Sequence, residues 1–186
     1  YSFHTITSMF FLGIGLQYVT TMLTDAIGAL RPDLITAYHA QMSSQGYDDL
    51  SLLLLVYSVI LAPVIEETVF RGLVFRYARH AMPFWFANIL QAALFGFVHM
   101  NLVQGIYAFA MGLFLGWVCR RGHGIKYSIP VHIVFNIIGC FFSGLIQISL
   151  TLSYPLFAGL GIMLTIFALW LFYTDFQTAD HSRSNA

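Results

Sequence analysis

With 186 residues, the chain is long enough for one domain. Hydrophobic residues make up 59% of it and charged residues only 9%, against roughly 25% charged in soluble domains. This composition excludes a soluble protein and predicts a single integral-membrane domain over residues 1–186. The formal net charge is zero and no basic stripe is present, which excludes a nucleic-acid partner.

Several apolar segments approach the ~20 residues that a transmembrane helix needs. Their hydrophobic runs are continuous and do not alternate, which indicates helices and not the strands of a barrel. We therefore expect an all-α, multi-pass transmembrane bundle of about six helices. The sequence begins at Tyr1 and not at a Met, which suggests a trimmed N-terminus. The six segments are roughly 3–28, 50–75, 84–100, 102–119, 128–150 and 154–174.

The polar connections between these segments differ in charge. Six alternating crossings would place 76–83, 120–127 and the tail 175–186 on one side, which collects six of the eight Lys and Arg residues. The connection 29–49 is polar, slightly acidic and on the other side. Because cytoplasmic loops carry an excess of Lys and Arg, the basic side is predicted to be cytoplasmic, with both termini inside.

The two glutamates of the chain, Glu66 and Glu67, are adjacent and lie at the end of an apolar run. A carboxylate in a hydrocarbon environment must be paired, protonated or used. Glu67 and Arg71 are spaced i, i+4 and can pair on one helix face, whereas Glu66 points about 100° away, toward the face of Phe70. A lone Glu–Arg pair could simply lock helices together. The second glutamate argues against that alternative, so Glu66 is the candidate general base.

Two histidines and an asparagine lie in helices that contain no other charged residue. His99 ends one predicted helix, and His132 and Asn136 are spaced i, i+4 on another. One such histidine alone would more often be a hydrogen-bonded core residue. Together with the glutamates, these residues supply groups that bind water or metal, a base, and an amide donor for an oxyanion.

The depth of these residues in the membrane presents a difficulty. At about 1.5 Å per residue, His99 lies roughly 20 Å from the loop 76–83, but His132 only roughly 8 Å from the loop 120–127. For the two histidines to share a site, helices must tilt or break, or the third helix must start well outside the membrane.

Ala108, Gly112 and Gly116 form a stripe of small residues at four-residue spacing. Small residues at this spacing let helices approach closely. We expect them to serve tight packing inside the bundle and not a dimer interface.

Three motifs together resemble the CPBP family, the CAAX-processing and bacteriocin-processing (Abi) intramembrane proteases. They are Glu66-Glu67-Thr-Val-Phe-Arg71, Phe95-x-x-x-His99 and His132-x-x-x-Asn136, and they occupy a core of about residues 50–140. The resemblance implies an intramembrane endopeptidase that cleaves a peptide or membrane-associated protein. Its substrate would be of the CAAX type or a bacterial leader or signal peptide such as that of a bacteriocin. The small size of the chain favours a bacterial cell membrane.

The resemblance also implies a role for each motif residue. Glu66 and His99 would hold and activate a water, and His132 and Asn136 would stabilise the oxyanion. Glu67 and Arg71 would support them. Whether a metal takes part is left open: Glu66, His99 and His132 would be the ligands of a zinc ion if one is used, and a metal-free mechanism needs the same residues.

Two other functions are compatible with some of these residues. A non-catalytic immunity or partner-binding membrane protein of the same fold would not need the complete motif set. A proton-coupled carrier or haem-binding bundle could use paired histidines, but it gives the Glu66–Glu67 pair and Asn136 no role. The motifs therefore favour the endopeptidase.

Overall fold

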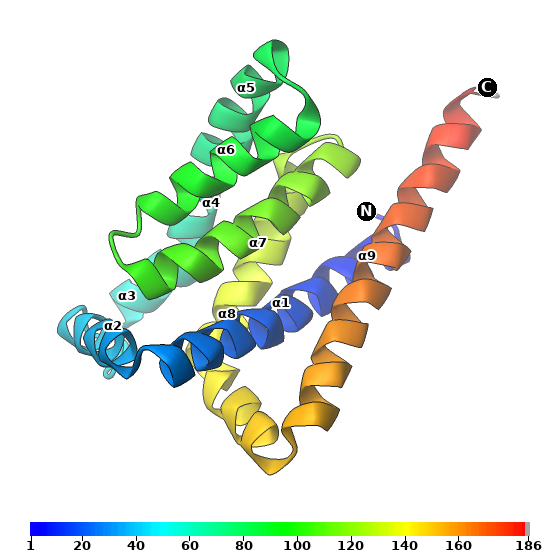
Figure 1. Ribbon diagram of the computed structural model, residues 1–186. Coiled ribbons are helices and arrows are strands. Elements are labelled where there is room, and N and C mark those ends of the chain that lie inside the picture. The colour runs from blue at the N-terminus through cyan, green and yellow to red at the C-terminus, as the bar shows by residue number, and fades with distance from the viewer. Residues whose placement is uncertain (185–186) are drawn as a thin grey trace.

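The computed structural model describes residues 1–184, with side chains as far as Gln177, and within that range it consists of helices and their connections (Figure 1). The predicted all-α class is confirmed. The helices are α1 (Phe3–Leu30), α2 (Pro32–Ser44), α3 (Leu52–Val56), η1 (Tyr57–Leu61), α4 (Ala62–Glu67), η2 (Thr68–Phe75), α5 (Arg76–Ala81), α6 (Phe84–Phe97), α7 (Leu102–Arg121), α8 (Ile125–Leu152) and α9 (Tyr154–Ser184), where η denotes a π-helix.

Five helices of the described residues are long and apolar enough to cross a membrane. They are α1, α7, α8, the Tyr154–Gln177 part of α9, and the continuous helix Leu52–Ala81, which we call the glutamate helix and which contains α3, η1, α4, η2 and α5.

The third predicted crossing, 84–100, is not one of these five membrane-spanning helices. Helix α6 has only 14 residues, a rise of about 21 Å against a hydrocarbon core of about 30 Å. It is therefore too short to span a membrane alone, and it packs along α7.

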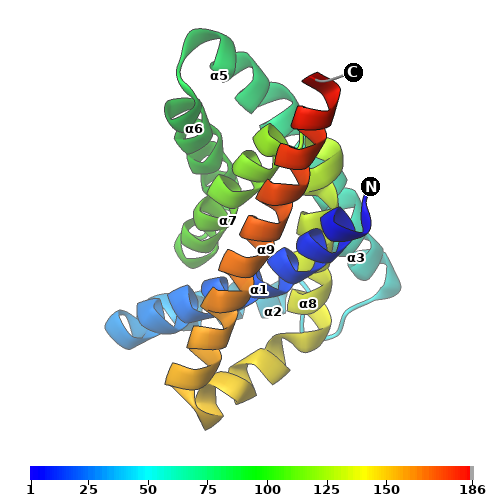
Figure 2. The ribbon, with the colours of Figure 1, turned by 90° about the vertical axis from the view of Figure 1, so that its right-hand side faces the viewer.

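The chain nevertheless reverses direction at each connection between the long elements. Figures 1 and 2 show the α5–α6 turn at the top of the molecule and the α8–α9 turn at the bottom, and in Figure 1 the α7–α8 turn lies toward the top. The basic residues Arg76, Arg79, Arg120 and Lys126 thus gather at one end, as the alternating arrangement requires. Which end faces the cytoplasm stays a prediction.

The polar connection 29–49 contains a helix that the sequence analysis did not predict. Pro32 at the start of α2 and Asp33 in its first turn both suit a helix N-terminus. No residue of α2 is buried, but Gln41 accepts a hydrogen bond of 2.8 Å from Asn101 Nδ2. Helix α2 therefore contacts the turn between α6 and α7.

The small residues of α7 allow α6 to pack closely against it. A Cβ added at Gly116 would lie 1.8 Å from Asn88 Oδ1, and one at Gly112 would lie 3.0 Å from Ala92 Cβ. The prediction that this stripe serves packing inside the bundle is confirmed. Two buried amides of α6 add hydrogen bonds to α7 carbonyls, because Asn88 donates to Leu113 O at 3.0 Å and Gln91 to Gly112 O at 2.8 Å.

The glutamate helix changes hydrogen-bond register twice, with π-helices on either side of α4. Pro63 explains the first change locally. In a π-helix the carbonyl of residue i accepts from the N–H of residue i+5, so Ser58 would need an N–H at Pro63, which has none. The neighbouring Ala62 N–H is bonded to Tyr57 O. Asn136 of α8 supplies the missing donor, with Nδ2 2.7 Å from Ser58 O.

Replacing Pro63 should make the hydrogen bond from Asn136 partly dispensable. In the otherwise natural chain, Asn136→Ala leaves a carbonyl without a donor, which is expected to lower stability by about 1–2 kcal/mol. In a Pro63→Ala background the new N–H at position 63 can bond Ser58 O, so the cost of Asn136→Ala should fall by about half. Unfolding of the four proteins in detergent measures this coupling.

Asn101→Ala is the matched control, because it removes another inter-element amide bond far along the chain from Pro63. It should show no coupling with Pro63→Ala. Strictly additive effects of Pro63→Ala and Asn136→Ala would show that Asn136 does not compensate for the proline.

Candidate active site

Glu67 and Arg71 form a buried ion pair within the glutamate helix. Arg71 Nη1 donates to Glu67 Oε1 at 2.8 Å, and both side chains are 0% exposed. The predicted i, i+4 pair is thus present. The Arg71 guanidinium also lies 4.5 Å above the centre of the Phe95 ring, and Gly112 provides room for it, because a Cβ there would lie 3.2 Å from Arg71 Nη2. Glu67 is therefore held inside the packing of three helices.

Glu66 has a different environment. Its side chain keeps 27% of its surface exposed, and Oε2 lies 3.6 Å from His132 Nε2. The other nitrogen of the same ring, His132 Nδ1, lies 3.0 Å from Glu67 Oε1. Adjacent residues of a helix point about 100° apart, which lets the two carboxylates reach opposite sides of one imidazole. The contact of His132 with both glutamates was not predicted from the sequence.

His99 completes the group at the end of α6. Its Nδ1 lies 2.8 Å from Phe95 O, so when it carries the proton this nitrogen donates to the carbonyl and Nε2 is left for another partner. The His99 side chain is only partly buried, which keeps it reachable for a ligand.

The Phe95 ring lies at the centre of the site. It makes edge contacts with Phe70 at 5.1 Å, with His99 at 5.0 Å and with His132 at 5.9 Å between ring centres, in addition to its contact with Arg71. Phe95 is fully buried. Phe95 begins the Phe95-x-x-x-His99 motif, but no role was predicted for it from the sequence. Its position one turn before His99, on the same helix face, was the available signal.

The difference in depth between the two histidines is resolved by where α6 begins and ends. Figure 1 shows that the α5–α6 turn extends beyond the α7–α8 turn, so α6 starts further out than α8. Because α6 is short and ends at Phe97, His99 reaches the level of His132. This is one of the conditions that the sequence analysis set for a shared site.

Asn136 also lies against the glutamate helix, but its side chain bonds to Ser58 and not to a glutamate. One turn along α8 from His132, it donates to Ser58 O, and the Ser58 hydroxyl lies 3.0 Å from the hydroxyl of Tyr47, in the segment before α3. An asparagine amide has two N–H donors, so one remains for a substrate oxygen. Ser58 and Tyr47 were missed in the sequence analysis, since a single hydroxyl in a helix or turn carries no distinctive pattern.

The donor groups do not form a metal-binding set in this arrangement. Within the described residues, no three His, Cys, Asp or Glu side chains are grouped closely enough to hold a metal ion. Both ring nitrogens of His132 already face carboxylates, and the His99 Nδ1 is at a carbonyl. The proposed zinc ligands Glu66, His99 and His132 therefore do not fit such an ion here.

Comparisons with known proteins concern the part of the chain that carries this site. Residues 48–138 match the family described as Type II CAAX prenyl endopeptidase Rce1-like. The "Putative membrane peptidase YdiL" of Bacillus subtilis (strain 168) is 30% identical over 84 residues, which cover 45% of this chain and 34% of that protein. The chain thus aligns with about a third of that relative's length. No solved structure matches.

All the candidate site residues, from Glu66 to Asn136, fall within the matched stretch. The three motifs, the helical fold and the sequence match therefore agree. Residues 48–138 of this chain thus match the Rce1-like, type II CAAX prenyl endopeptidase family, in agreement with the CPBP family that the motifs resemble.

Proposed function

We propose that this integral membrane protein is an endopeptidase in which Glu66 activates a water molecule for attack on a peptide bond. The family match over residues 48–138 supports a CAAX-type intramembrane protease in general. The observation that carries the proposal is the unequal placement of the two glutamates. Glu67 is enclosed with Arg71, whereas Glu66 is part-exposed and lies 3.6 Å from His132.

In this mechanism Glu66 takes a proton from a water that His99 helps to orient. The resulting hydroxide adds to the scissile carbonyl carbon, and the carbonyl oxygen becomes an oxyanion. His132 and the second N–H of Asn136 stabilise that charge. The carbon–nitrogen bond then breaks, and Glu66 returns the proton to the leaving amine.

Glu67 acts in this mechanism through His132. Its contact with Nδ1 orients the ring so that Nε2 faces Glu66, as a carboxylate orients a histidine in other hydrolases. Arg71 in turn holds Glu67 in place. The substrate is a peptide or membrane-associated protein of the CAAX type or a bacterial leader or signal peptide, and the location is a bacterial cell membrane.

Replacing each glutamate by glutamine should separate catalysis from stability. Glu66→Gln removes the base, so cleavage of a quenched peptide should fall by about 10²–10⁴-fold, with little change in the unfolding temperature. Glu67→Gln leaves the buried Arg71 charge uncompensated and should destabilise the protein by about 3–5 kcal/mol. Fluorescence cleavage assays and thermal unfolding of purified protein measure the two effects.

Asp33→Asn is the control for loss of a carboxylate, since Asp33 is exposed and pairs with Arg31 in another part of the molecule. It should cleave as the natural chain does. His99→Ala and His132→Ala should both be inactive yet folded. Cleavage by Glu66→Gln at the natural rate would rule out Glu66 as the base. No cleavage by the natural chain itself would favour the non-catalytic alternative.

Removal of metal ions should leave cleavage unchanged, because the proposed mechanism uses Glu66 as the base and both ring nitrogens of His132 already face carboxylates. The measurement compares peptide cleavage before and after dialysis against a chelator. Activity that disappears on chelation and returns with zinc would contradict the metal-free mechanism and assign Glu66, His99 and His132 to the metal.

The orientation of the bundle can be tested with a fused reporter. A fluorescent protein that matures only in the cytoplasm, joined after Ala186, should fluoresce in a bacterial host, because the basic end also holds both termini. A parallel fusion to alkaline phosphatase should be inactive. The reverse pair of results would overturn the cytoplasmic placement of the basic end.

A further inference from the structure

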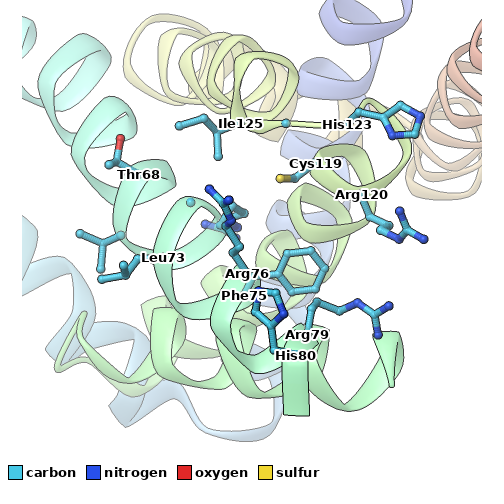
Figure 3. Close-up of a pocket in the computed structure, with 14 residues that line it drawn as sticks. Thr68, Leu73, Phe75, Arg76, Arg79, His80, Cys119, Arg120, His123 and Ile125 are labelled. Atoms are coloured by element: carbon cyan, nitrogen blue, oxygen red, sulfur yellow. The ribbon is translucent and has the colours of Figure 1, made fainter. Parts of the chain in front are cut away.

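A cavity of about 880 Å³ opens at the basic end of the molecule, apart from the proposed catalytic groups. It lies between the second half of the glutamate helix and the turn from α7 to α8 (Figure 3). Arg71 is the one candidate site residue in its lining, while Glu66, His99 and His132 do not line it. The cavity therefore reaches the back of the Arg71–Glu67 pair and not the proposed water site.

One end of this cavity is cationic. Arg76, Arg79 and Arg120 line it together with His80 and His123, and none of its described lining residues is acidic. Arg76 and Arg120 are exposed, and Arg79 Nη1 donates to Met82 O at 3.0 Å, which anchors its side chain. Figure 3 shows the Arg79 and Arg120 side chains extending toward the same side of the cavity. Such a cluster attracts a phosphate group.

The other wall of the cavity is apolar and faces outward. Val69 and Leu73 keep 40% and 53% of their surface exposed, and both line the cavity with Ile125. Both lie in a membrane-crossing helix, where exposed apolar side chains face lipid tails. Arg76 lies seven residues after Val69, a rise of about 10 Å toward the helix end. The cavity therefore changes from apolar to cationic along the direction from the membrane interior to its surface.

We propose that this cavity binds one anionic phospholipid, with its phosphate at Arg76, Arg79 and Arg120 and an acyl chain along Val69, Leu73 and Ile125. Basic pockets between transmembrane helices are suited to anionic lipid head groups. A free phosphate ion would use the cationic end alone and leave the apolar wall uncovered. The bound lipid also packs behind Arg71, so it stabilises the folded protein by mass action.

Binding can be measured with two lipids that differ only in head group, dioleoyl phosphatidylglycerol and dioleoyl phosphatidylcholine, added to the purified chain in detergent. Native mass spectrometry counts bound lipid, and thermal unfolding reports stabilisation. The anionic lipid should bind at least about 10-fold more tightly, given about 5-fold for each arginine near a lipid phosphate. It should also raise the unfolding temperature more than the zwitterionic lipid does.

Matched variants distinguish lipid binding in the cavity from a general attraction of anionic lipid to basic residues on the protein surface. Arg76→Gln with Arg120→Gln should abolish the preference for phosphatidylglycerol, and Arg76→Lys with Arg120→Lys should keep most of it. Both positions are exposed, so the variants are expected to fold, which their unfolding transition checks. Arg31→Gln is the control, because Arg31 is equally exposed but lies outside the cavity and pairs with Asp33. It should bind both lipids as the natural chain does.

Three results would overturn the proposal. The first is equal binding of the two lipids, or an equal loss of the preference for phosphatidylglycerol in Arg31→Gln and in the double glutamine variant. The second is displacement of phosphatidylglycerol by glycerol phosphate at the same concentration, which would indicate a site for a free anion. The third is one-for-one displacement by a peptide with a free carboxyl terminus, which would make the cavity a substrate site. None of these readouts depends on proteolytic activity.

Discussion

The structure depends on a buried ion pair, Glu67 with Arg71, inside an apolar bundle. Charges in such an environment are stable only when their polar atoms are paired and enclosed. Several unrelated features of the chain serve part of that requirement, while Glu67 Oε2, Arg71 Nε and Arg71 Nη2 are buried without a hydrogen-bond partner. The Phe95 ring covers the guanidinium, the His132 Nδ1 meets the carboxylate, and Gly112 leaves space for the second guanidinium nitrogen. The glutamate helix, α6, α7 and α8 are thereby joined at one point.

This pair also accounts for the exposure of its neighbour. Because Glu67 points into the bundle and adjacent helical residues diverge by about 100°, Glu66 must lie toward the edge, where its side chain is 27% exposed. The same imidazole, His132, contacts both carboxylates at different distances. One residue step along a helix thus separates a structural carboxylate from one that is available for chemistry.

The spacing of residues along the chain predicted much of this arrangement. It did not predict where helices end or which polar residues of different helices contact one another. The Glu67–Arg71 pair and the close packing at Gly112 and Gly116 followed from four-residue spacing, which a helix converts directly into contact. The short length of α6 did not follow, because the apolar run continues past Phe97 to residues that do not extend the helix. Helix α2 was also missed, since its polar sequence has no buried face. The bond from Asn136 to Ser58 O depends on a proline in a different helix.

The sequence by itself determined that this is a helical membrane protein and which polar residues could do chemistry, because composition and motif spacing are properties of the chain alone. Only the tertiary structure decided which of those residues are enclosed in structural contacts and which remain accessible for chemistry. It placed His99 level with His132 and packed the Phe95 ring against both histidines. It also positioned Asn136 to donate a hydrogen bond to Ser58 O. The physical reason is that these relations are distances between helices, and they are set by where α6 starts and ends and by how closely small residues let helices approach.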